Sequence, residues 1–184
     1  MAIEKYTTEC IVVESFNNGE HDKVYKVFTR DFGMILAHAK SIRKLESKLR
    51  AHIQERSVSL ITLVQGRDVF RLVGAEERYT EKMFIHEVVS LLKRFVRGEG
   101  AHKALYDRLI IFLKTKASYD ISLSRTLLYY IVLVELGYAD SKVIGAKSNK
   151  EYVSWTNDDL YTHCILSHAL VKAHVHDVLK EMQL

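Results

Sequence analysis

Two periods of hydrophobic alternation divide the chain. Up to about residue 75, apolar residues recur at every second position in short runs, as in strands that bury one face. Beyond Glu76–Glu81 they recur at spacings of three and four, as on helices with one buried stripe. The pattern predicts an α+β protein with a β-rich domain over residues 1–79 and a helical bundle domain over residues 80–184.

Five short strands are expected in the first domain. They are separated by turn signals such as Asn17-Asn18-Gly19-Glu20, Gly33 and Gly66. The expected strands are residues 6–14, 24–28, 34–40, 58–64 and 68–73. With a helix-period insertion between the third and the fourth strand, this order fits a five-stranded Greek-key β-barrel of the OB type, although the pattern alone leaves other small barrels open.

The insertion, residues 40–56, combines a helix-like apolar stripe with concentrated positive charge. The stripe consists of Ile42, Leu45, Leu49 and Ile53. Six basic residues stand against Glu46 and Glu55, so the net +4 of this segment equals the net +4 of the whole chain. A patch of this kind favours a polyanionic partner, and the alternative is an ordinary solvated helix face.

Nucleic-acid binding requires cations that neutralise phosphates and aromatic rings on which bases stack. The candidate residues are Lys23, Lys26, Arg30, Phe32, Lys40, Arg43, Lys44, Lys48 and Arg50. Phe32 falls in a turn, so its ring should be exposed. A second basic set lies on the expected helices and is taken mostly as solvated: Lys93, Arg94, Arg97, Lys103, Arg108, Lys114 and Lys116.

The helical domain is expected to contain three helices, a loop and a final helical stretch. Apolar stripes mark residues 84–95 and 105–113, and a third helix is expected from the N-cap Ser122 through Val134. Asp140–Trp155 is polar and is predicted to be a loop, and a last helical stretch opens at Asp158 or Asp159.

A resemblance to a known family is carried by several short motifs in order. TTECIVVESFNNGEHDKVYKVFT and FTRDFGMILAHAKSIRKLESKLRAHIQERS are similar to the N-terminal signature of RecO, the bacterial recombinational DNA-repair protein, and LLYYIVLVELGYA is a weaker echo. The resemblance covers residues 6–76 well and 81–139 loosely, and it favours the OB type among small barrels. Ser41 departs from the usual Ala-Lys-Gly of the family, and Gln54-Glu55 departs from its Gln-Pro.

The resemblance implies a non-enzymatic recombination mediator. Such proteins bind single- and double-stranded DNA, anneal complementary strands and help to load recombinase onto DNA coated by single-strand-binding protein. The implied partners are RecR and the C-terminal tail of single-strand-binding protein, with no small-molecule substrate. The expected location is cytoplasmic, with nucleoid association during repair.

Catalytic, cofactor and metal chemistry find little support. The sequence has no nucleophile elbow, no Walker loop and no GxGxxG motif, so we expect neither an enzyme nor a cofactor. Cys164 and His168 have the spacing of one helix face, but no third metal ligand joins them. Some RecO proteins carry a four-cysteine zinc module, and with Cys10 and Cys164 as its only cysteines this chain resembles a short form without it.

Composition and local hydropathy agree with a cytosolic globular protein. The chain is 48% hydrophobic and 27% charged, which are globular values. Two isolated thiols suit a reducing compartment. The first residues lack the apolar core of a signal peptide, and Leu127–Val134 is too short to span a bilayer, so no membrane partner is expected.

Other classes of function remain open. A protein-interaction adaptor that keeps the barrel without binding DNA would have its cations at residues 40–50 dispersed and salt-bridged, for example with Glu46. An RNA-binding OB protein would prefer RNA over DNA of equal sequence, through contacts to the 2′-hydroxyl. A metal-dependent enzyme is the most distant alternative.

Overall fold

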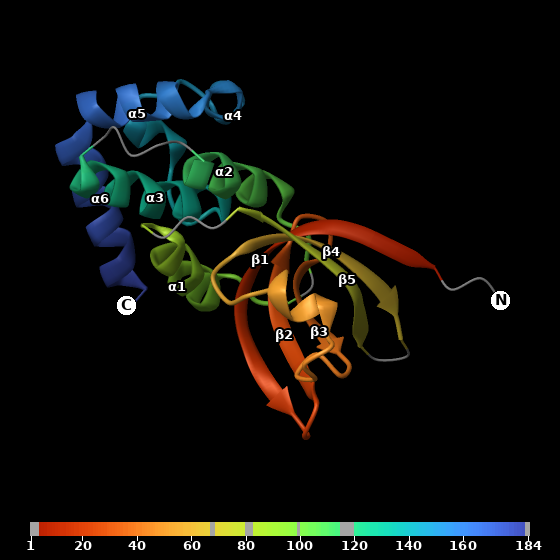
Figure 1. Ribbon diagram of the computed structural model, residues 1–184. Coiled ribbons are helices and arrows are strands. Elements are labelled where there is room, and N and C mark those ends of the chain that lie inside the picture. Colours follow the sequence, from red (N-terminus) through yellow and green to blue (C-terminus); the bar gives the residue numbers. More distant parts are fainter. Residues whose placement is uncertain (1–3, 67–68, 80–82, 99, 115–119, 183–184) are drawn as a thin grey trace. The chain divides into compact units, whose positions relative to one another are not determined.

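The computed structural model describes residues 4–66, 69–79, 83–98, 100–114 and 120–182 (Figure 1). The chain divides into two compact units, Met1–Tyr106 and Asp107–Leu184. The first unit contains the strands and the first helix, and the division falls within the second helix. The boundary near residue 80 stays a prediction.

The first unit is built on a closed barrel. Its strands are β1 (Lys5–Asn18), β2 (Asp22–Thr29), β3 (Gly33–Ala39), β4 (Val58–Gln65) and β5 (Phe70–Tyr79). They follow one another around the barrel in the order β1-β2-β3-β5-β4. The β3–β5 pair is parallel and closes the barrel, whereas the other neighbours are antiparallel. The barrel followed by helices confirms the predicted α+β fold with an N-terminal OB-type barrel.

The barrel interior is filled by the alternating apolar positions of the strands. On β2 the inward residues are Tyr25 and Val27, which belong to one buried cluster with Cys10 and Val12 of β1. The opposite face of β2 is covered too, because the Phe28 ring lies 5.8 Å from the ring of Tyr106. Both faces of this strand are therefore apolar near its end, which weakens the simple alternation in its sequence.

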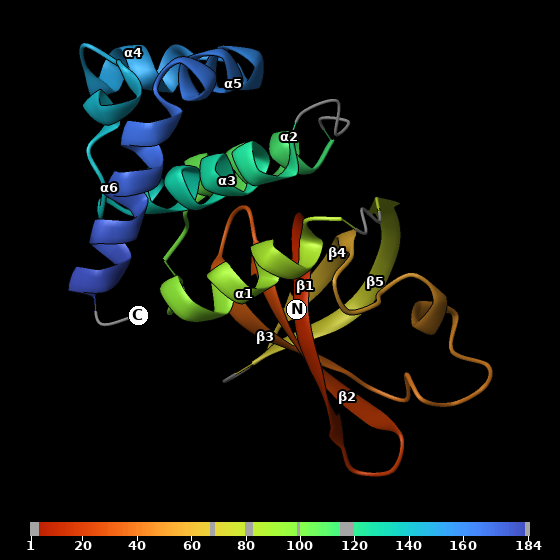
Figure 2. The same cartoon turned by 90° about the vertical axis from the view of Figure 1, so that its left-hand side faces the viewer.

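The connection between β3 and β4, residues 40–57, is here called the basic connection. It loops out from the barrel strands before it returns to β4 (Figure 2). The helix predicted for it is wrong, because the segment consists of turns and one short 3-10 helix, η1 (Lys48–Ala51). Ile42 and Ile53 are 1% and 2% exposed within the barrel core, whereas Leu45 is 93% exposed.

The apolar residues of the basic connection therefore do not form one helix face. Instead, Ile42 and Ile53 are buried separately in the barrel core and anchor the two ends of the connection. Burying Ile42 and Ile53 in the barrel stabilises the connection at both ends more than a short, isolated helix would. Ser41, near the start of the basic connection, adopts the left-handed backbone conformation, with φ 53°. This is a backbone conformation that favours glycine, the residue of the family pattern at this position.

The helices are α1 (Ile85–Phe95), α2 (Lys103–Lys114), α3 (Ile121–Glu135), α4 (Asn149–Ser154), α5 (Asn157–Leu166) and α6 (His168–Glu181). In the first unit α1 lies against β1, and in the second unit α3 packs against α5 and α6. Leu127 and Ile131 of α3 are fully buried, as expected for the central helix. None of the helices in the described ranges is long and apolar enough to cross a membrane.

Three expectations for the second unit are wrong in detail. Asp120, rather than Ser122, caps α3, because its side chain accepts a hydrogen bond from the backbone N–H of Leu123. The predicted loop 140–155 contains α4 and the 3-10 helix η2 (Ser141–Ile144). Thr156 opens α5 through a capping box with Asp159.

Cys164 and His168 do not share a helix face. Ser167 separates two helices, so Cys164 belongs to α5 whereas His168 begins α6. Among the residues that the structure describes, no group of three or more histidine, cysteine or carboxylate side chains is arranged to hold a metal ion.

Candidate nucleic-acid interface

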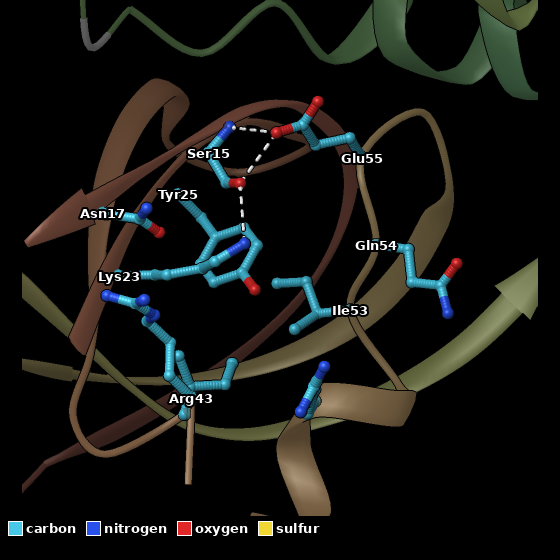
Figure 3. A pocket seen from close by; sticks show the side chains of 10 residues that line it. Ser15, Asn17, Lys23, Tyr25, Arg43, Ile53, Gln54 and Glu55 are labelled. Atoms are coloured by element: carbon cyan, nitrogen blue, oxygen red, sulfur yellow. Dashed lines mark hydrogen bonds between the residues drawn. The ribbon is translucent and has the colours of Figure 1, made fainter. Parts of the chain in front are cut away.

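A hollow of about 610 Å³ lies between the β1–β2 hairpin and the basic connection (Figure 3). Three cationic side chains line it: Lys23 from β2, Arg43 from the start of the connection and Arg50 from η1. All three are among the residues predicted to bind DNA. The structure thus brings together cations from separate segments at one site.

Strand pairing positions the β-strand side of the hollow. In the β1–β2 register Asn17 faces Lys23, and Ser15 faces Tyr25. Cross-strand partners point to the same face of a sheet, so these four residues share one side. Tyr25 is 4% exposed and continues into the barrel core.

A register shift in β1 explains why Ser15 and Asn17 lie on this side. Val12 pairs with Val27 inside the barrel, but the register shifts between Val12 and Glu14. The extra residue of such a bulge reverses the inward and outward positions that follow it. Glu14 therefore points outward. Period-2 alternation in the sequence carries no signal for a bulge, so Ser15 was not among the predicted site residues.

Arg43 ties the basic connection to the hairpin. Its backbone N–H donates to the carbonyl oxygen of His21 at 3.0 Å, and its Nη1 donates to the carbonyl oxygen of Gly19 at 3.0 Å. Together with the buried anchors Ile42 and Ile53, these bonds hold the connection beside the hairpin. The cations of the basic connection are therefore held beside the hairpin by hydrogen bonds to its backbone and by the burial of these two apolar side chains.

Glu55 is the one carboxylate among the residues that line the hollow. One of its oxygens accepts hydrogen bonds from the backbone N–H of Ser15 at 2.9 Å and from the Ser15 hydroxyl at 2.7 Å. Lys23 Nζ lies 3.4 Å from the same hydroxyl oxygen and 6.0 Å from the centroid of the Tyr25 ring. Burial raises the pKa of Tyr25, Glu55 adds to the increase and Arg50 opposes it, so the phenol stays neutral at physiological pH.

Lys40, Lys44 and Lys48 lie along the rest of the basic connection and are exposed. Neither these lysines nor Glu46 forms an ion pair with any residue in the described part of the chain. Their charges are screened by solvent and counterions alone. An anionic polymer would therefore displace counterions here without first breaking protein ion pairs.

Two predicted cations are engaged within the protein. Lys26 lies on the outer face of β2, with its Nζ 3.5 Å from a carboxylate oxygen of Glu14, and Lys93 contacts the same carboxylate. Arg30 Nη1 lies 3.8 Å from a carboxylate oxygen of Asp31, which Lys103 also approaches at 3.6 Å. These positions carry less uncompensated charge than those of the basic connection.

Phe32 is half-buried rather than free in its turn. Its ring centroid lies 5.6 Å from that of Tyr6 and 5.4 Å from that of Phe70, and all three rings pack against the barrel core. Tyr6 and Ser15 lie toward opposite ends of β1, so this aromatic group is separate from the hollow. The exposed ring expected from sequence is thus replaced by a packed cluster.

The comparisons with known proteins concern the barrel end of the chain. Residues 1–78 match the family described as Recombination protein O N terminal. The chain is 32% identical over 71 residues to "DNA repair protein RecO" of Dehalococcoides mccartyi (strain CBDB1), which is 39% of this chain and 28% of that protein.

Two further relatives carry the same printed name. The protein of Heliobacterium modesticaldum is 34% identical over 71 residues, 39% of this chain and 26% of the relative. That of Synechocystis sp. (strain ATCC 27184 / PCC 6803 / Kazusa) is 33% identical over 75 residues, 41% of this chain and 28% of the relative. The chain thus matches less than a third of the length of these relatives.

Proposed function

We propose that this chain, whose residues 1–78 match the N-terminal family of RecO, is a non-enzymatic DNA-binding mediator of recombinational DNA repair. It binds single- and double-stranded DNA, promotes annealing of complementary strands and assists the loading of recombinase. RecR and the C-terminal tail of single-strand-binding protein are its proposed protein partners.

The observation that carries this proposal is the unpaired charge of the basic connection. Lys40, Lys44, Lys48 and Arg50 are exposed, and none of them has an ion-pair partner among the described residues. An adaptor that does not bind DNA predicts the reverse, with these cations neutralised by neighbours such as Glu46. The state of these side chains therefore favours a polyanionic ligand over a purely protein ligand.

The mechanism is electrostatic. Cations on the basic connection neutralise phosphates, which releases condensed counterions and lowers the repulsion between two strands. Base pairing between the strands then supplies the sequence specificity, so the protein needs no base-reading element. Lys23 of β2, which lines the same hollow as Arg43 of the connection, extends the positive surface onto the barrel.

The state of the thiols supports the absence of covalent catalysis. Burial raises the pKa of Cys164 to about 11, and burial raises the pKa of Cys10 even further. A thiol in this state is a poor nucleophile at physiological pH. Both side chains act as small packed hydrophobic groups.

Fluorescence anisotropy of labelled oligonucleotides across a salt series tests the proposal. Single-stranded DNA, duplex DNA and RNA of equal sequence are compared on the wild type and on Lys44→Glu/Lys48→Glu. Binding of single-stranded DNA should weaken with salt at a log–log slope of about −0.7 per phosphate contact. The double variant should bind at least roughly tenfold more weakly, with a shallower slope, because it loses two of these contacts and adds repulsion.

Lys150→Glu/Lys172→Glu is the matched control, since it makes the same change in net charge at exposed positions of α4 and α6. Its affinity should stay near that of the wild type. No binding of any oligonucleotide at low salt would remove the basis of the proposal and favour the adaptor. A consistent preference for RNA would favour the RNA-binding alternative.

A further inference from the structure

We propose that the hollow between the β1–β2 hairpin and the basic connection binds the terminal phosphate of a DNA strand. This inference rests on the proposed function, because it assigns one site within the DNA-binding surface. Lys23, Arg43 and Arg50 are the phosphate ligands. The exposed lysines of the connection remain contacts to the strand backbone.

The volume of the hollow suits one nucleotide. Its volume of about 610 Å³ falls within the range of about 300–1,000 Å³ that is typical of small-molecule sites. Its apolar lining is formed by Ile42 and Ile53, which are buried, and by the ring of Tyr25. Because these three side chains are almost fully buried, they form the floor of the hollow, and its exposed lining is mainly polar.

The charge of the hollow matches a terminal phosphate better than an internal one. Three cations and the single carboxylate Glu55 leave a net charge of +2 among its lining residues. A phosphate monoester carries about −1.5 to −2 at neutral pH and three terminal oxygens, whereas a phosphodiester carries a single charge. Glu55 is held by the Ser15 donors, and the described residues include no ion pair between it and the three cations.

The cations retain donors for a ligand. A guanidinium group has five N–H donors, and within the described residues the Arg43 side chain uses one of its nitrogens, to reach Gly19. The Lys23 ammonium group makes one long hydrogen bond to a described residue, 3.4 Å to the Ser15 hydroxyl (Figure 3). The Arg50 side chain has no hydrogen bond to a described residue. Convergent donors of this kind favour an anion with several oxygens.

The test compares internally labelled single-stranded oligonucleotides of one sequence that differ only at their ends. One carries a 5′-phosphate, one a 3′-phosphate, and one has hydroxyl groups at both ends. The wild type should bind a phosphorylated strand about tenfold more tightly than the unphosphorylated strand, the factor expected for one additional charge-assisted hydrogen bond. Inorganic phosphate and a deoxynucleoside monophosphate serve as competitors that separate a free phosphate from a strand end.

Arg50→Gln should abolish this end preference, whereas Lys48→Gln is the matched control. Both side chains are exposed on η1, but only Arg50 lines the hollow. Lys48→Gln should weaken binding of all three strands alike and keep the preference. Circular dichroism of both variants checks that they are folded.

Each outcome separates the inference from the proposed function. Equal affinity for all three strands would overturn the inference and leave DNA binding intact, as would an end preference that survives in Arg50→Gln. Competition by the monophosphate that is as strong as that of the phosphorylated strand would identify a free-nucleotide site and overturn the strand-end assignment. No binding of any strand at low salt would overturn the proposed function itself.

Discussion

Two arginines of this chain show opposite uses of the same side chain. Arg108 in the helical unit is 9% exposed, and its Nη1 donates to the carbonyl oxygen of Trp155 at 2.7 Å. Its Nη2 donates to the carbonyl oxygens of Tyr152 at 2.8 Å and Val153 at 3.2 Å, and its Nε lies 3.5 Å from a carboxylate oxygen of Glu135.

Arg50 on the basic connection is exposed and has no such partner in the described residues. The cations of the helices were expected to be mostly solvated, and Arg108 is an exception to that expectation. The difference teaches that the number of cations in a segment does not indicate their role. A guanidinium group whose three nitrogens all have partners inside the protein stabilises the fold, whereas one with free donors is available to a ligand.

The largest expected effect is on stability, from Arg108→Met. This change leaves Glu135 without its partner and leaves the carbonyl groups of the α4 end without their donor. We expect a loss of about 3–5 kcal/mol in the free energy of unfolding, the usual cost of breaking a buried ion pair on one side. Chemical denaturation of the full chain measures it, with the exposed Lys172→Met as control.

The pH dependence of the same variant sharpens this prediction. Burial raises the pKa of Glu135, and Arg108 opposes the increase. Without Arg108 the pKa rises further, so the stability deficit should grow as the pH rises from 5 toward 8, because the ionised carboxylate is then disfavoured in the fold. A deficit below about 1 kcal/mol at neutral pH would mean that Arg108 has only a surface role.

A smaller effect is expected at the start of the basic connection, from Ser41→Gly. The left-handed φ of 53° is unfavourable for serine and not for glycine. Allowing for the greater freedom of glycine in the unfolded chain, we expect a gain of about 0.5–1 kcal/mol in the free energy of unfolding. Ser47→Gly, at φ −70°, is the control and should give no gain. If Ser41→Gly destabilises the protein, the conformation of the connection is not as described.

The smallest expected effect on stability comes from Glu14, which forms ion pairs with Lys26 and Lys93 on the outer face of the barrel. Lys93 holds the pKa of Glu14 below its usual value, burial opposes this, and Lys26 adds to the lowering. The stabilising contribution is therefore present above the unfolded pKa of about 4.5 and is lost as the pH falls through the folded value. Glu14→Gln should cost up to about 1 kcal/mol at pH 7, and the difference from the wild type should narrow below pH 4.5. Glu46→Gln, which removes no ion pair within the described residues, is the control and should leave the free energy of unfolding at pH 7 near the wild-type value.

The strands and the first three helices were predictable because each buries residues at the regular period of its own geometry. Val27 inside the barrel and Leu127 inside the helical unit follow these local periods. Local patterns do not show which distant segments a residue packs against in the fold. Ile42 and Ile53 follow a helical spacing, yet each is buried separately in the barrel.

The candidate site was only partly predictable for the same reason. Lys23, Arg43 and Arg50 were identified by their charge, but their convergence depends on the β1 bulge and on the path of the connection. Lys26 carries the same charge, and only the fold shows that Glu14 engages it. The partners of a charged side chain come from segments that are distant in the sequence, and a single sequence does not show which of these segments lie next to each other in the fold.

The salt dependence of single-stranded DNA binding in two matched double variants distinguishes the roles of the unpaired and the ion-paired cations. Lys44→Gln/Lys48→Gln removes two unpaired cations of the basic connection, and Lys26→Gln/Lys93→Gln removes two cations that engage Glu14. We expect the first variant to lower the magnitude of the log–log slope by up to about 1.4, and the second to leave it near the wild-type value. Equal slopes in the two variants, or a larger loss in the second, would show that the basic connection is not the DNA-binding surface.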